Sequence, residues 1–174
     1  MSLVMIEKAR PHVTVLRLNR PQRLNAMSFE LMTELYDALR QVTADNSAWV
    51  VVLTGEGRGF CSGLDLEDPG MIPGIDDMSV ARIGMLAMGH FSRIVPALRD
   101  LPQPVVAAIN GPAYGGGLCL TLGADLRFAA ASAEFNATGI VNGLTSTELG
   151  ASWLLPRLIG ASRANDLLLT GRKV

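Results

Sequence analysis

The sequence predicts an α/β fold with parallel strands, because three features of the chain agree. Short apolar runs alternate with segments whose apolar residues recur every three or four positions, the pattern of strands separated by helices. Two of the runs end in glycine-rich stretches, at 59–66 and 110–118. Parallel strands share one carboxyl edge, and ligands of such folds bind beyond that edge. We therefore expect both glycine-rich stretches to belong to one site.

In the first third of the chain, two strands flank a helix. Val13 to Leu18 alternates apolar and polar residues before a turn at 19–21, which predicts a strand. Ser28 is a residue type that caps helix N-termini, and a helix is predicted to follow it. The apolar positions on the buried face of this helix are Met32, Leu35, Tyr36 and Leu39. The apolar run from Trp49 to Leu53 predicts a strand covered on both faces.

A long connection and several further elements follow. Residues 68–77 hold two prolines and two glycines among acidic residues, which predicts a surface loop, either a lid or a plain connection. Apolar residues at steps of three or four from Val80 to Leu98 predict one long amphipathic helix. Strands are predicted at 105–109 and 126–130, and helices at 118–122, 149–158 and 162–170.

Composition limits the classes of function. The 174 residues are 49% apolar and 18% charged, which is typical of one globular domain, here residues 1–174. The net charge of −1 and the scattered basic residues argue against binding to nucleic acid or to an anionic membrane surface. Because the sequence has neither a signal-peptide pattern at its start nor an apolar run approaching 18 residues, we expect a cytoplasmic protein. The high apolar content also predicts self-association.

The cysteines and histidines indicate no metal site. Cys61, Cys119, His12 and His90 match no spacing of metal ligands, and the two cysteines are far apart in sequence. We expect both thiols to be small buried groups in a reducing compartment. An acyl-accepting nucleophile at Cys119 is the alternative, although no basic residue lies near it in sequence.

The glycine-rich stretches match an oxyanion hole better than a nucleotide site. Phe60 stands where a dinucleotide fingerprint starting at Gly55 needs its third glycine, and the second stretch lacks the Lys-Ser/Thr of a phosphate loop. Gly115 to Gly117 open a predicted helix, where free N–H groups and the positive end of the helix dipole coincide. Tight packing of helix on strand is the alternative reason for these glycines. Two N–H groups, one from each stretch, would polarise a carbonyl oxygen.

Three segments carry a family resemblance. Residues 19–27 (NRPQRLNAM), 59–66 (GFCSGLDL) and 110–117 (NGPAYGGG), in this order and spacing, resemble the enoyl-CoA hydratase/isomerase (crotonase) family. The resemblance spans essentially the whole chain. It implies a spiral of ββα units, a homotrimer or homohexamer, and an acyl-CoA substrate with no separate cofactor. Relatives continue past residue 174 with further helices, so we expect an incomplete C-terminal helical part.

The resemblance also implies which residues act. The N–H groups of Ser62 and Gly116 would polarise the thioester carbonyl and stabilise an enolate. Arg23 would meet a phosphate of coenzyme A, or it is a solvated surface arginine. The implied binding set for coenzyme A consists of Arg23, Leu24, Ala26, Ser62, Gly63, Leu64, Asp65, Leu66 and Gly116.

The departures from the family pattern point to one reaction over another. Cys119 stands where hydratases of the two-glutamate type carry their first carboxylate, and no acid stands at 138–139, near the place of the second. Glu148, eight residues before Pro156, occupies the place of the single acid of isomerase branches; it could also be a first-turn helix residue. We expect double-bond isomerisation with Glu148 as the proton carrier. The alternatives are hydration by a non-standard acid or base, and acyl-CoA binding without catalysis.

Overall fold

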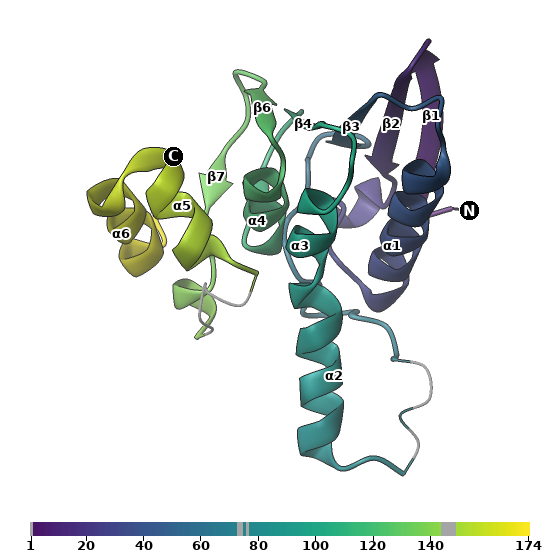
Figure 1. Cartoon of the computed structure of the whole chain (residues 1–174). Helices are drawn as coiled ribbons and strands as arrows, with labels where there is room; N and C mark the ends of the chain where they lie inside the picture. The colour runs from purple at the N-terminus through teal and green to yellow at the C-terminus, as the bar shows by residue number, and fades with distance from the viewer. Residues whose placement is uncertain (1, 73–74, 76, 144–148) are drawn as a thin grey trace.

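A five-stranded sheet forms the centre of the protein, in the order β1-β2-β3-β4-β6 (Figure 1). The computed structural model describes residues 2–72, 75, 77–143 and 149–174. The strands are β1 (Val4–Arg10), β2 (Val13–Leu18), β3 (Val50–Gly55), β4 (Val105–Ile109) and β6 (Leu126–Ala129). β1 is antiparallel to β2, and the other three pairs are parallel. The predicted α/β class is confirmed, and four strands present their carboxyl ends at the same edge.

β1 has no counterpart among the predicted strands. Its sequence contains Glu, Lys and Ala, residue types that are depleted in strands. Pairing with β2 holds it in place, with Val4 opposite Leu18, and the Arg17 Nε atom donates to Glu7 Oε1 at 3.0 Å. An edge strand of this kind is specified by its neighbour rather than by its own pattern of residues.

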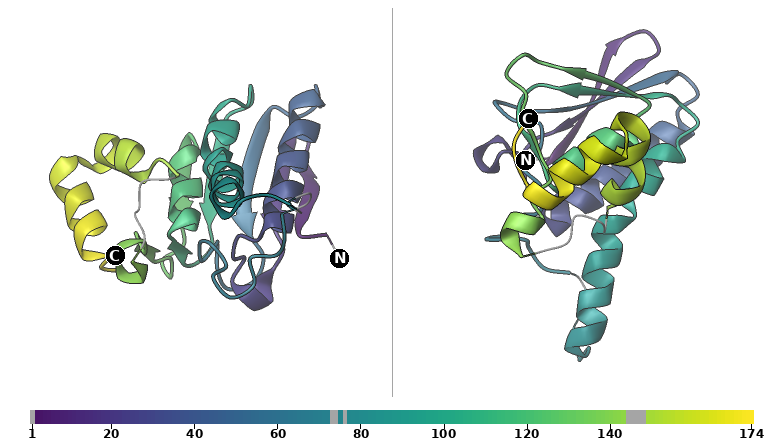
Figure 2. Two further views of the ribbon diagram at one scale, coloured as in Figure 1. Left: turned by 90° about the horizontal axis from the view of Figure 1, so that it is seen from below. Right: turned by 90° about the vertical axis from the view of Figure 1, so that its left-hand side faces the viewer.

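Helices α1 (Phe29–Ala44), α3 (Ile94–Arg99) and α4 (Gly116–Gly123) lie on one face of the sheet (Figures 1 and 2). α1 begins as predicted, because the Ser28 hydroxyl accepts the Leu31 N–H at 3.3 Å. Arg127 closes α4 at its other end, where the guanidinium donates to the carbonyl oxygens of Thr121 and Ala124 at 3.1 and 2.6 Å. These contacts satisfy main-chain groups that helix ends leave unpaired.

Only one face of β3 is fully buried, so the prediction that both faces are covered is wrong. Val51 and Leu53 are inaccessible to solvent, whereas Val50 and Val52 are half-buried. Trp49 precedes the strand, is 62% exposed, and stacks on His12 with 3.8 Å between ring centroids. The apolar run therefore continues past the part of the strand that the core covers.

The long helix predicted for 80–98 is divided into α2 (Val80–Ser92) and α3, with Arg93 between them. Pro96 explains the break, because proline has no N–H to donate to the Ser92 carbonyl and its ring collides with that group. α2 projects away from the sheet and from the other helices (Figure 1).

Two short strands form a second sheet. β5 (Ala113–Tyr114) pairs in parallel with β7 (Phe135–Asn136), and the short helix η2 (Ile140–Asn142) comes next. α5 (Ala151–Ile159) and α6 (Ala161–Thr170) confirm the helices predicted for the tail, and both lie to one side of the sheet (Figure 2). None of the helices in the described part of the chain has the length and apolar character needed to cross a membrane.

Candidate functional site

A cavity of about 810 Å³ lies where segments that follow β2, β3, β5 and β7 converge. Both glycine-rich stretches contribute to its wall, as the sequence predicts. Its volume is in the range of small-molecule and cofactor sites. The described residues that line it include Arg23, Leu24, Arg58, Ser62, Leu64, Asp65, Leu66, Glu67, Met88, Gly115, Gly116, Leu118, Cys119, Ala137, Thr138 and Leu149.

Direct main-chain contact joins the two glycine-rich stretches. The Tyr114 N–H donates to the Cys61 carbonyl at 2.9 Å. Gly63 has a φ of +94°, and a Cβ atom there would lie 2.8 Å from the Tyr114 oxygen and 3.3 Å from the Gly116 nitrogen. A Cβ atom on Gly117 would collide with the Cys61 carbonyl oxygen. Close packing therefore explains Gly63 and Gly117, and it brings residue 63 within reach of the Gly116 amide.

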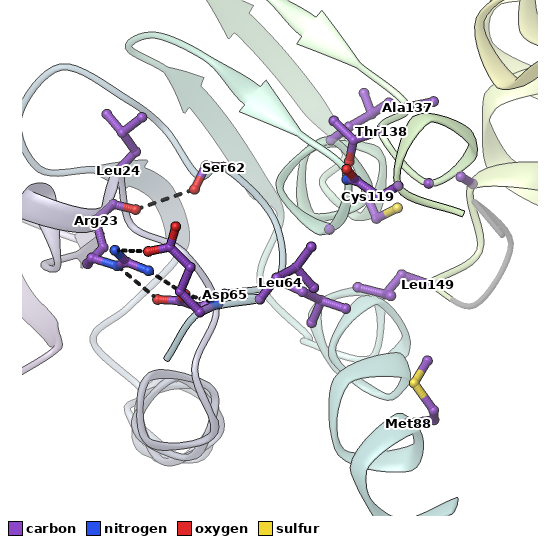
Figure 3. Close-up of a pocket in the computed structure, with 18 of the residues that line it drawn as sticks. Arg23, Leu24, Ser62, Leu64, Asp65, Met88, Cys119, Ala137, Thr138 and Leu149 are labelled. Atoms are coloured by element: carbon purple, nitrogen blue, oxygen red, sulfur yellow. Dashed lines mark hydrogen bonds and ion pairs between the residues drawn. The ribbon is translucent and has the colours of Figure 1, made fainter. Parts of the chain in front are cut away.

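Ser62 does not offer its N–H to the cavity. That group donates to the Leu24 carbonyl oxygen at 3.0 Å, and the Ser62 hydroxyl lies 3.4 Å from the Arg23 carbonyl (Figure 3). An N–H already bonded within the protein cannot also stabilise a substrate oxygen without breaking that bond. The predicted role of Ser62 as an oxyanion donor is wrong for this reason.

Leu64, which is not among the donors predicted from the sequence, has an N–H that is not bonded within the described residues. Leu64 pairs with Met27 in a short parallel bridge, in which the Met27 N–H donates to the Gly63 oxygen at 2.8 Å and the Asp65 N–H to the Met27 oxygen at 3.1 Å. Bonds to a strand partner alternate along the chain, so the N–H of Leu64 itself points away from Met27. It donates to no acceptor within the described residues, and Leu64 lines the cavity.

Gly116 is the first residue of α4, and its N–H has no helical acceptor. This N–H donates to no group in the part of the chain that the structure describes, and Gly116 also lines the cavity. The positive end of the helix dipole adds to its pull on negative charge. Leu64 and Gly116 thus each bring an unbonded main-chain N–H to the same cavity.

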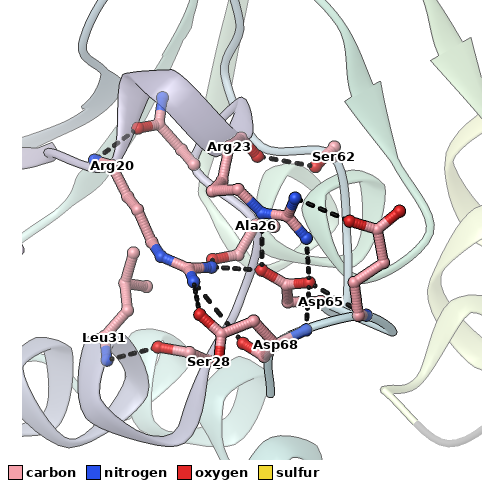
Figure 4. A network of polar contacts seen from close by, with 10 residues as sticks. Arg20, Arg23, Ala26, Ser28, Leu31, Ser62, Asp65 and Asp68 are labelled. Atoms are coloured by element: carbon pink, nitrogen blue, oxygen red, sulfur yellow. Dashed lines mark hydrogen bonds and ion pairs between the residues drawn. The ribbon is translucent and has the colours of Figure 1, made fainter. Parts of the chain in front are cut away.

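At the end of the cavity near Leu24, charged side chains form a network of ion pairs and hydrogen bonds (Figure 4). Asp65 has only 2% of its side chain exposed and forms ion pairs with Arg20 and with Arg23, the latter at 2.7 Å. Arg23 bonding, aided by the main-chain N–H groups of Glu67 and Asp68, holds the pKa of Asp65 well below its usual range. Asp65 is therefore an ionised anchor for this loop and not a proton carrier.

The two arginines that line the cavity, Arg23 and Arg58, differ in whether a carboxylate pairs with them. Arg23 is engaged by both Asp65 and Glu67, the second pair at 2.7 Å. Arg58 lines the same cavity, is exposed, and forms no ion pair with any described residue. Among the described residues that line the cavity, Arg58 is thus the arginine that remains available to a bound anion, and it is not among the residues predicted from the sequence. The feature of the sequence that could have indicated Arg58 is its position directly before Gly59, where the first glycine-rich stretch begins.

Two residues of the predicted binding set are not on the wall. Ala26 and Gly63 are buried, and neither is among the described residues that line the cavity. Ala26 uses its carbonyl to accept from Arg20 at 3.4 Å. Both residues lie behind the residues of the wall. The other members of the predicted set line the cavity, namely Arg23, Leu24, Ser62, Leu64, Asp65, Leu66 and Gly116.

The opposite end of the cavity is mostly apolar, with the Thr138 side chain next to Cys119 (Figure 3). Met88, Leu118, Cys119 and Leu149 line it, and no described carboxylate does so at this end. Cys119, Thr138 and Gly139 line the cavity; the family resemblance implies the two acids of two-glutamate hydratases at 119 and near 138–139. Glu148 lies outside the described residues, directly before Leu149. The other thiol, Cys61, is fully buried, and burial raises its pKa to about 12.

Known proteins share this fold and these segments. The model of the Enoyl-CoA hydratase/isomerase family matches residues 8–174. A protein of Mycobacterium tuberculosis named "Probable enoyl-CoA hydratase EchA12" is 51% identical over 173 residues, which are 99% of this chain and 61% of that protein. The 1,2-epoxyphenylacetyl-CoA isomerase of Escherichia coli is 40% identical over 162 residues, 93% of this chain and 60% of the relative.

Solved structures agree. A crystal structure described as a probable enoyl-CoA hydratase/isomerase from Mycobacterium abscessus has a TM-score of 0.93 at 47% identity, covering 99% of this chain and 64% of that one. A monofunctional enoyl-CoA isomerase from M. smegmatis has a TM-score of 0.80 at 45% identity, covering 100% and 70%. The chain is an α/β protein of the crotonase fold. It belongs to the enoyl-CoA hydratase/isomerase family, and it spans about 60% of the length of the curated relatives described above.

Proposed function

We propose that this protein binds an acyl-CoA thioester and stabilises its enolate with the N–H groups of Leu64 and Gly116. The observation that carries the proposal is the pair of unbonded main-chain donors on one cavity wall, held together at Gly63. Two such donors match the needs of a thioester oxygen that gains negative charge in the transition state. The enolate is the charge-bearing species that family members have in common.

The two ends of the cavity orient this ligand. Arg58 and Arg23 stand at the end that would receive the phosphates of coenzyme A, since guanidinium groups pair well with phosphate oxygens. The apolar end beyond Leu64 would receive the acyl group. The thioester carbonyl then lies between them, next to the Leu64 and Gly116 amides.

The reaction that we propose is a double-bond shift with Glu148 as the single proton carrier. Glu148 would take a proton from the α-carbon of a 3-enoyl thioester and return it to the γ-carbon, so that the double bond moves into conjugation. No acid stands at 119 or at 138–139 to supply the carboxylates for water addition. The monofunctional isomerase of M. smegmatis among the similar structures also favours this choice. Hydration is the second candidate, because relatives at about half identity are named hydratases.

An oligomer built on trimers completes the proposal. Leu126 and Phe128 on the edge strand β6 are 55% and 66% exposed, which is apolar surface that association would cover. We propose a homotrimer or homohexamer, which light scattering can identify.

The test compares turnover with binding. Glu148→Gln keeps the size of the side chain and removes its charge, so we expect loss of 3-octenoyl-CoA isomerisation, followed by the absorbance of the conjugated thioester. Calorimetric titration with octanoyl-CoA should give the same affinity for this variant and the parent. Unchanged turnover would remove Glu148 from the reaction. Absence of binding in the parent protein would overturn the acyl-CoA assignment itself.

A further inference from the structure

The apolar end of the cavity is bounded on one side by a single α2 side chain. Met88 is the only residue of α2 among the described residues that line the cavity. Leu149 lies next to it in Figure 3, and Leu118 of α4 also lines the cavity. The length of the cavity, measured from the Leu64 and Gly116 amides to this wall, therefore depends on the position of Met88.

α2 is attached to the rest of the protein at its C-terminal end. Phe91 is buried and packs on Phe29 with 4.8 Å between ring centroids, and the Tyr36 hydroxyl donates to the His90 carbonyl at 2.6 Å. Burial raises the pKa of Tyr36 to about 12, so its hydroxyl keeps the proton that it donates. Met88 lies less than one helical turn before this anchor.

The remainder of α2 has few neighbours. Cβ atoms added at Gly84 and Gly89 would meet nothing within 4 Å, and Met85 is 77% exposed. Few buried contacts are what allow a segment to shift at low cost. A methionine on such a helix is also an adaptable wall, because its unbranched thioether adopts many shapes.

We propose that Met88 is a specificity-determining residue, which sets the length of the uncharged, apolar acyl chain that the site accepts. This inference rests on the proposed acyl-CoA function. The described residues at this end offer no charge to pair with a second carboxylate, so a dicarboxylic acyl group is disfavoured. Each acyl methylene that reaches the Met88 wall should tighten binding about fourfold.

The experiment measures how affinity depends on chain length and does not require turnover. Butanoyl-, octanoyl- and dodecanoyl-CoA are titrated calorimetrically into the parent protein and into Met88→Trp and Met88→Ala. Met85→Trp and Met85→Ala are matched controls, because Met85 is the same residue type on the same helix, is 77% exposed against 40% for Met88, and is not among the described residues that line the cavity. Thermal unfolding confirms that all five proteins are folded.

We expect Met88→Trp to shorten the accepted chain. Its preference for dodecanoyl- over butanoyl-CoA should fall about fifteenfold, equivalent to two methylenes, while Met85→Trp should keep the preference of the parent. Met88→Ala should move the optimum toward dodecanoyl-CoA. Identical profiles for the Met88 and Met85 variants would overturn the assignment of Met88 and leave acyl-CoA binding intact. If the parent binds none of the three thioesters, the proposed function fails as well.

Discussion

Removal of the Gly116 N–H is the sharpest perturbation of the proposed oxyanion hole. Proline deletes this donor, and it is well tolerated at the first position of a helix, where the N–H has no helical partner. A Cβ atom at residue 116 would, however, lie 2.5 Å from the Met27 sulfur. The substitution Gly116→Pro is therefore made together with Met27→Ala, which removes the colliding atoms. Gly116→Ala in the same Met27→Ala background is the control, because it adds the same Cβ atom and keeps the N–H.

The expected magnitude follows from what one donor contributes. Loss of one oxyanion-hole donor costs about 2.7 to 4 kcal/mol of transition-state stabilisation, which is about a hundredfold to a thousandfold in kcat. Met27 is inaccessible to solvent, so Met27→Ala alone should reduce the free energy of unfolding by about 2 to 5 kcal/mol. Both double variants share that loss of stability. Their ratio of rates therefore reports on the N–H group.

The assay is the rate of 3-octenoyl-CoA isomerisation at saturating substrate, with the urea midpoint of unfolding measured for each protein. We expect equal urea midpoints for the two double variants and a kcat at least about a hundredfold lower for the proline variant. Equal kcat values at equal stability would refute the reasoning, because the Gly116 N–H would then do nothing in the transition state.

Three further perturbations test the charged end and the buried thiol. Asp65→Asn should lower the free energy of unfolding by about 3 to 5 kcal/mol at pH 7, because Arg20 loses its buried partner. The pKa of Asp65 is lowered in the native state, so the Asp65 carboxylate contributes fully to the free energy of unfolding above its ordinary pKa of about 3.9, and this contribution is lost as the pH falls below that value. The urea midpoints of the parent and the variant should therefore converge in acid. A difference in midpoint that stays constant with pH would contradict this role of Asp65. Arg58→Ala should weaken octanoyl-CoA binding about tenfold and leave octanoyl-pantetheine binding unchanged; equal losses for both ligands would show that Arg58 does not meet phosphate. Cys61 should stay unmodified by iodoacetamide at pH 8 in the native protein, as mass spectrometry can show, and rapid labelling would contradict the burial of its thiol.

Elements with strong local signals could be predicted from the sequence. α1 has both an N-cap at Ser28 and a regular apolar face, and its start is as predicted. β1 could not be found this way, because Glu7, Lys8 and Ala9 are depleted in strands and pairing with β2 holds them in this conformation. The break at Arg93 differs from this, because Pro96 signals it in the sequence. The apolar period continues through it, and Pro96 disrupts the main-chain bonds without interrupting that period.

The candidate site shows the same division at finer scale. The sequence places a flexible residue, Gly63, between Ser62 and Leu64, and either neighbour could turn its N–H into the cavity. Along a regular extended strand, amides two residues apart point to the same side. The φ of +94° at Gly63 breaks that rule, so the Ser62 N–H meets Leu24 while the Leu64 N–H faces away from Met27. Which amide is free is decided by contacts with the segment at 24–27, about 40 residues earlier in the chain. A motif can therefore identify a glycine-rich loop at the candidate site, but only the tertiary pairing shows which of its amides is unbonded.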